Sequence, residues 1–213
     1  MAENIIYPNT QNEFAVIHLG DAGSDSQDTS FGSRTVYLAE RFRGTRVRFY
    51  SIDLQGWYVD DSLNITNIKA DYYSGLRIFR DESVSLVVSD VSFGFYDNAG
   101  KYFYQELFCG EDISVETSYL AEVIGLVWDK LKPNRRFYVS GNPLTIALIE
   151  QTMKSMGIEN VETRPFRSRE YNRTPWTRNT AFSSLEQLTM IKSDSCLHLP
   201  DYNNIMDEVN KRR

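Results

Sequence analysis

Four segments of the sequence combine glycines or aspartates with an apolar, strand-like run and could do chemistry. The first is the loop of residues 18–24, which holds two glycines and an aspartate. The others centre on Asp53, Asp71 and Asp90, each of which lies in or at the end of a β-rich segment. Glycines let backbone N–H groups approach a ligand closely. An aspartate at a strand end can accept hydrogen bonds from ribose hydroxyls, so the four segments indicate a nucleotide-type site.

Each segment also has a plainer interpretation. Clusters of Gly, Asp and Ser after strands are usually ordinary turns, and an aspartate in such a place often caps a helix or lies in a solvated turn. The order of the segments favours a ligand site. The loop glycines, an acid for the ribose, an acid for an adenine edge and an acid after the next strand follow one another as one crevice requires.

The elements that must position these groups follow from the apolar patterning. Strands are predicted at residues 14–19, 46–53, 65–73, 84–91, 135–140, 160–166 and 185–191, and helices at residues 35–42, 116–131 and 142–157. Strands that alternate with helices predict a doubly wound, mostly parallel α/β sheet. The last two strands have only a polar loop between them, so we expect an antiparallel last strand in a seven-stranded sheet.

Composition and charge narrow the class of protein. The 213 residues suit one domain, expected at residues 1–194 with a polar C-terminal tail at 195–213 that holds a short helix near residues 205–211. The formal net charge of −6 does not by itself attract nucleic acid or anionic membranes. Cys109 and Cys196 lack metal-ligand spacing, so we expect no metal site and two free thiols, with a disulfide between them as the alternative. Without a secretory signal or a long apolar run, a cytoplasmic protein with no membrane partner is expected.

Taken in order, these segments resemble the class I S-adenosylmethionine (SAM)-dependent methyltransferases over roughly residues 14–194. The segments that resemble the family's early motifs are VIHLGDAGS, FYSIDLQ, KADYY and SLVVSDVSF. Those that resemble its later motifs are LKPNRRFYVSG, SMGIENVETRPF and LEQLTMI. The resemblance implies the family's fold, SAM as cofactor and S-adenosylhomocysteine (SAH) as product.

The resemblance also implies roles for individual residues. Those assigned to the cofactor are His18, Gly20, Asp21, Gly23, Asp53, Asp71 and Asp90. Asp53 is expected on the ribose hydroxyls, Asp71 near the adenine, and Asp90 beside the reacting methyl group as the candidate catalytic residue. Residues 90–93 (DVSF) are similar to the (Asp/Asn)-Pro-Pro-(Phe/Tyr) motif of amino-methyltransferases, with both prolines missing. The alternative is that Asp90 only ends its strand and orders the next turn.

Two positions of the first loop depart from the family pattern. His18 stands where the family commonly has an acid, and Ala22 where it commonly has a glycine. They leave open a catalytically inactive, methyltransferase-like domain that acts as a binding or structural module. A nicotinamide-dependent oxidoreductase is a third hypothesis, disfavoured because the GxGxxG pattern is absent.

Residues 164–178 form an arginine-rich segment that could bind an acceptor. They hold five arginines against one acid, Glu170. The candidate substrate-binding residues are Arg167, Arg169, Arg173 and Trp176. Guanidinium groups suit phosphate or carboxylate, and aromatic rings stack on bases. We expect an anionic acceptor, either RNA or a phosphorylated or carboxylated small molecule; the alternative is a solvated polar loop with no role in binding.

Overall fold

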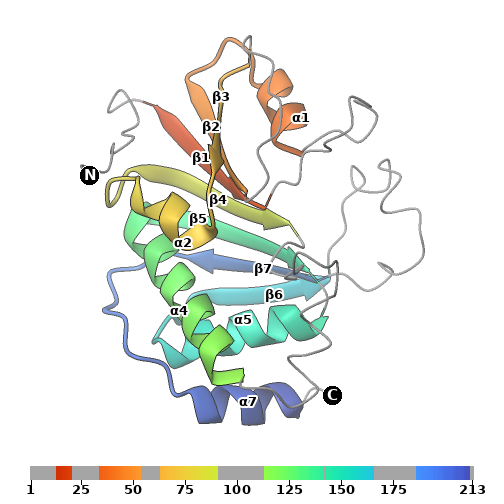
Figure 1. The fold of residues 1–213 in the computed structure, drawn as a ribbon, viewed down its shortest axis with the longest axis vertical. Coiled ribbons are helices and arrows are strands. Elements are labelled where there is room, and N and C mark those ends of the chain that lie inside the picture. The colour runs from red at the N-terminus through yellow and green to blue at the C-terminus, as the bar shows by residue number, and fades with distance from the viewer. Residues whose placement is uncertain are drawn as a thin grey trace.

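The chain forms a twisted sheet with helices on both faces (Figure 1). The computed structural model describes residues 13–20, 34–53, 63–90, 113–141, 143–165 and 186–211. The strands of the described part are β1 (Phe14–Leu19), β2 (Val47–Asp53), β3 (Ile65–Lys69), β4 (Val84–Asp90), β5 (Leu131–Gly141), β6 (Val161–Pro165) and β7 (Glu186–Ile191).

The order of the strands across the sheet is β3-β2-β1-β4-β5-β7-β6. The pairs from β3 to β5 are all parallel, whereas β7 is antiparallel to both β5 and β6. The strand order therefore switches between β1 and β4, and in open sheets of this kind ligands bind outside the carboxyl ends of the strands at such a switch point. The predicted seven-stranded, mostly parallel sheet with an antiparallel last strand is confirmed.

The helices divide unequally between the two faces (Figure 1). One face is covered by α2 (Tyr72–Arg77), α4 (Ile113–Lys130) and α5 (Pro143–Ser155), and α1 (Arg34–Arg41) lies on the other. The side chains of β1 point alternately toward these two faces. Ile17 and Leu19 join the large core under α4 and α5, whereas Val16 joins a smaller core with Ala39 of α1.

The helix α4 supplies the largest apolar face of the domain. Among its buried residues, those at the spacing predicted from the sequence are Leu120, Val123, Ile124, Val127 and Trp128. They pack against Val87 of β4 and Phe137 of β5, both fully buried. Each of these side chains contributes about 1.5–3 kcal/mol by leaving water. Their burial therefore holds α4 against β4 and β5.

One predicted strand is wrong in its second half. Residues 65–73 were expected to be extended throughout, but β3 ends at Lys69 and α2 begins at Tyr72. The reason is the side chain of Asp71, which accepts a hydrogen bond from the backbone N–H of Ser74 and so caps the new helix. A local cap therefore prevails over the β propensity of two tyrosines.

The C-terminal segment carries a packed helix, α7 (Tyr202–Asn210). Asp201 caps it, and Ile205 and Val209 are buried against α5 and α4. It begins three residues before the predicted start, at 205. The domain boundary between residues 194 and 195 stays a prediction.

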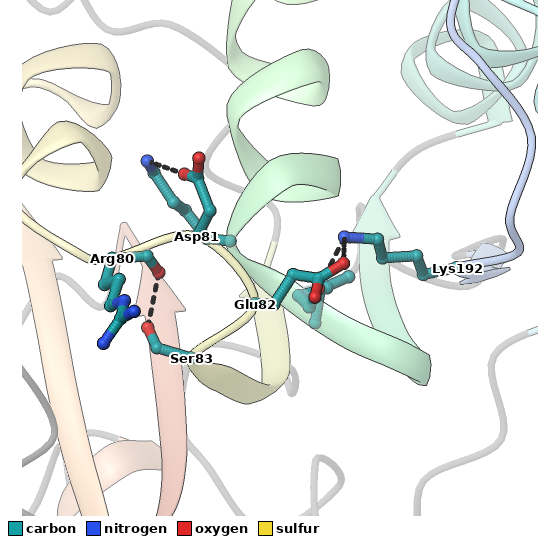
Figure 2. Close-up of polar contacts among 7 residues, drawn as sticks. Arg80, Asp81, Glu82, Ser83 and Lys192 are labelled. Atoms are coloured by element: carbon teal, nitrogen blue, oxygen red, sulfur yellow. Dashed lines mark hydrogen bonds and ion pairs between the residues drawn. The ribbon is translucent and has the colours of Figure 1, made fainter.

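Charged side chains at the amino ends of β4 and β5 neutralise one another (Figure 2). Lys192 is buried, and its Nζ donates to the Leu131 carbonyl at 2.8 Å and lies 3.4 Å from Glu82 Oε1. Lys130 pairs in the same way with Asp81 at 2.5 Å. These charges are therefore compensated locally, and the predicted site residues Asp53 and Asp90, which end β2 and β4, are at the opposite edge of the sheet.

Candidate functional site

Gly20 begins the site at the carboxyl end of β1. Its φ of 71° is in the left-handed region, where a side chain would be strained. Its backbone N–H donates to the Ile52 carbonyl at 2.9 Å. On the other side of β1, the buried hydroxyl of Ser89 donates to the Leu19 carbonyl at 3.3 Å. Hydrogen bonds thus join the carboxyl ends of β1, β2 and β4 to one another.

Asp53 and Asp71 extend this line across the next two strand ends. Asp53 is the last residue of β2, and its carbonyl accepts a hydrogen bond of 3.0 Å from the Ala70 N–H. Asp71 follows directly, so the two acids occupy neighbouring positions at the same edge. Ser74 holds the Asp71 carboxylate through its N–H at 2.9 Å and its hydroxyl at 2.7 Å. The backbones of Asp53 and Asp71 therefore lie close together at this edge, and the Asp71 carboxylate is held in place by Ser74.

The hydrogen bonds of Asp71 predict how stability depends on pH. Partial burial acts to raise the pKa of Asp71, but the Ser74 N–H and hydroxyl and further backbone N–H groups outweigh it and lower the pKa. A lowered folded-state pKa adds stability above the unfolded value, and this is lost as the pH falls through the folded value. Asp71→Ala should therefore cost about 1 kcal/mol of unfolding free energy at neutral pH, and the difference should vanish in acid.

Urea denaturation at neutral and at acid pH measures this difference. Asp71→Ser is the matched control, because a serine also caps helices well. It should retain most of the stability at both pH values. An Asp71→Ala penalty that is equal at neutral and acid pH contradicts the role of the ionised carboxylate.

His18 lies inside the fold at the same edge. It is 3% exposed, and its Nδ1 is 2.7 Å from the hydroxyl of Thr35, which is buried in the first turn of α1. Which of the two groups donates depends on the imidazole tautomer. The contact joins β1 to α1 at the two ends of residues 21–33. It gives His18 a positioning role, and its predicted contact with the cofactor stays a prediction.

The remaining predicted site residues are only partly described. Asp90 is the last residue of β4, which places it at the crevice; its side chain lies outside the described residues. The others that lie outside them are Asp21, Gly23, Arg167, Arg169, Arg173 and Trp176. Their roles stay predictions.

Sequence reasoning missed three residues that shape the site: Thr35, Ser74 and Ser89. A signal for the Ser74 contact was present in Asp71 itself, because aspartate is a favoured N-cap residue that accepts from the backbone two or three positions on. Nothing in the sequence pairs Thr35 with His18 or Ser89 with Leu19, since these contacts join residues 17 and 70 positions apart.

Two further expectations concern metals and membranes. Among the described residues, no three His, Cys, Asp or Glu side chains come close enough together to hold a metal ion. In the same part of the chain, no helix combines the length and apolar character that crossing a bilayer demands.

Comparison with solved structures defines the class of fold. A SAM-dependent methyltransferase from Archaeoglobus fulgidus superposes with a TM-score of 0.50 at 13% identity, over 87% of this chain and 89% of that one. The chain therefore has the fold of the class I SAM-dependent methyltransferases, as its strand order and antiparallel β7 also indicate.

Two other similar structures carry related titles. A predicted O-methyltransferase from Agrobacterium tumefaciens has a TM-score of 0.49 at 14% identity, covering 96% of this chain and 92% of that one. A 16S rRNA adenine N1-methyltransferase from Catenulisporales acidiphilia, with SAM bound, has a TM-score of 0.48 at 11% identity, over 85% and 87%. No protein-family model and no curated protein matches the sequence.

Proposed function

We propose that this chain is a SAM-dependent methyltransferase. The observation that carries the proposal is the line of groups at the carboxyl edge of the sheet, where Gly20 follows β1, Asp53 ends β2 and Asp71 comes two residues after β3. The fold shared with the Archaeoglobus enzyme supports it, because ligands of such sheets bind at this edge.

The described residues fit SAM by the chemistry of their groups. Asp53 offers carboxylate oxygens to the two ribose hydroxyls, which are hydrogen-bond donors. Asp71 offers a carboxylate held by Ser74 to the adenine amino group, another donor. Gly20, with its positive φ, has no side chain that would hold the methionine part of SAM away from the backbone.

The chain's own contribution to catalysis is positioning. SAM supplies a sulfonium-bound methyl group, which passes to a nucleophilic nitrogen or oxygen of the acceptor as the carbon–sulfur bond breaks and SAH leaves. The residues at the strand ends must orient the acceptor and exclude water. Asp90, at the end of β4, is the group we assign to accept the proton that the acceptor releases.

The acceptor is proposed to be anionic. Because β6 runs parallel to β5, its last residue, Pro165, lies at the same edge as the site, and the arginine-rich segment starts there. Guanidinium groups at this position suit phosphate or carboxylate. RNA and a phosphorylated or carboxylated small molecule share this chemistry.

The triple variant Arg167→Ala, Arg169→Ala and Arg173→Ala tests the anionic acceptor. Filter binding of bulk tRNA tests RNA as the acceptor, and calorimetry with a nucleoside monophosphate tests a phosphorylated small molecule. The variant is expected to bind its ligand at least about tenfold more weakly and with a shallower salt dependence, because each phosphate contact contributes to the salt slope. Unchanged affinity and salt slope would refute the proposal.

Calorimetric titration with SAM, SAH and NAD tests the proposed function itself. Binding of SAM and SAH, together with no binding of NAD, is the expected result. No binding of any of them favours the inactive-module alternative, and binding of NAD alone favours the oxidoreductase.

A further inference from the structure

Ser140 is a buried serine whose hydroxyl is not satisfied by the fold. It is 1% exposed, and among the described side chains its Oγ is one of very few buried polar atoms without a hydrogen-bond partner. Such an atom costs free energy, because its hydrogen bonds to water are lost and not replaced. A buried group of this kind in a native fold calls for a partner from outside the protein, either an ordered water or a ligand group.

The position of Ser140 in β5 gives this hydroxyl a place in the site. It is the last residue but one of β5, and the register pairs it with Asp90 of β4 and Gln187 of β7. It therefore lies at the carboxyl edge of the sheet, level with the proposed catalytic residue. Alternation puts it on the face opposite Val139, whose side chain packs in the large core under α4 and α5.

His18 occupies the same face at the same edge. Its neighbours Ile17 and Leu19 point into the large core, so its imidazole lies on the face that Ser140 shares. Both side chains are buried, but His18 contacts Thr35 and Ser140 contacts no polar group in the described structure.

A second buried serine shows that the fold can satisfy such a group. Ser89, on β4 at the same edge, is fully buried and donates to the Leu19 carbonyl. The two serines therefore differ in whether a protein carbonyl lies within reach of the hydroxyl, and Ser140 has no such carbonyl among the described residues.

The strand order separates two halves of the crevice. Asp53 and Asp71 follow β2 and β3 on one side of β1, whereas Asp90 and Ser140 lie on β4 and β5 on the other. The first half holds carboxylates, whose oxygens can accept hydrogen bonds from the hydroxyl and amino groups of a nucleoside. The second half is left for the molecule that receives the methyl group.

We propose that Ser140 Oγ binds the methyl acceptor and positions the atom to be methylated beside Asp90. A hydroxyl donates one hydrogen bond and accepts two, so it suits a neutral nitrogen or oxygen group, such as an amide, an amine, a hydroxyl or a ring nitrogen. This inference rests on the proposed function, and it makes Ser140 an acceptor-positioning residue that does not hold the cofactor.

The stability of two alanine variants gives the first test. Ser140→Ala removes an unsatisfied hydroxyl and should raise the Tm by about 2 °C or more. The matched control, Ser89→Ala, removes a satisfied hydroxyl and should lower the Tm. A fall for Ser140→Ala as large as that for Ser89→Ala overturns the inference, because it means that Ser140 is bonded within the protein.

A formamide soak of crystals grown with SAH gives the second test. Formamide is expected within hydrogen-bond distance of Ser140 Oγ in the wild type and not in Ser140→Ala. Formamide absent from the wild-type site, or equally present in both crystals, overturns the inference.

Calorimetry with SAH separates failure of this inference from failure of the proposed function. Wild-type protein that does not bind SAH refutes the proposed function. Wild-type protein that binds SAH while the formamide or Tm result fails refutes only the role of Ser140. The SAH affinity of Ser140→Ala is expected within twofold of the wild type; a large loss assigns Ser140 to the cofactor and overturns the inference.

Discussion

Replacing Asp53 with alanine should weaken SAH binding about 100-fold. Asp53 is the last residue of β2, and its backbone carbonyl accepts a hydrogen bond from Ala70, the residue before Asp71. Hydrogen bonds from two ribose hydroxyls to an ionised oxygen are each worth about 1.5–3 kcal/mol. Loss of about 3 kcal/mol in all corresponds to roughly two orders of magnitude in Kd. Isothermal calorimetry with SAH measures the change.

Two comparison variants show whether the loss comes from the carboxylate. Asp53→Asn keeps one oxygen that accepts hydrogen bonds. Its SAH affinity should fall only about tenfold, which corresponds to a loss of roughly 1.4 kcal/mol of binding free energy. Glu159→Ala removes an exposed acid near the start of β6, at the opposite edge of the sheet, and should leave Kd unchanged. Full SAH affinity in Asp53→Ala, with an unchanged Tm, contradicts the placement of the ribose on β2.

Replacing Gly75 with alanine should destabilise the protein by about 1–3 kcal/mol, although alanine is the better helix former. Gly75 is buried in α2, where a Cβ would collide with Cγ2 of Ile52 on β2. Ile52 is fully buried and cannot move aside freely. Its carbonyl also holds Gly20, so a shift of β2 should weaken SAH binding as well.

The matched control is Gly125→Ala in α4. There a new Cβ would meet only Met156 Cε at 3.9 Å, an ordinary contact. This variant should gain about 0.5–1 kcal/mol, because alanine loses less backbone entropy on folding than glycine. Urea denaturation of both variants measures the two changes in the free energy of unfolding. Equal effects of the two substitutions would mean that α2 does not press on β2.

Much of the fold follows from local patterning. Apolar runs and helical spacing located all seven described strands and the long helix α4 within a few residues, and the polar loop before β7 predicted its antiparallel direction. The error at residues 70–73 came from the same local reasoning. A capping aspartate and a strand-ending aspartate look alike until the Ser74 bond is seen.

The order of Gly20, Asp53 and Asp71 along the chain was enough to predict a common edge, because parallel strands bring their carboxyl ends together. Other features depend on contacts between residues far apart in the chain. No sequence pattern distinguishes Ser140 from Ser89, yet one hydroxyl finds a carbonyl on the neighbouring strand and the other does not.

The sequence by itself determined the elements, their order and the acids at the strand ends, since these depend on local propensity and periodicity. Only the tertiary structure decided which polar groups find a hydrogen-bond partner within the fold. That depends on strand register and on which face is covered, as the contact of His18 with Thr35 shows. Gly20, directly after β1, is therefore part of an edge to which β2 and β4 also contribute through hydrogen bonds.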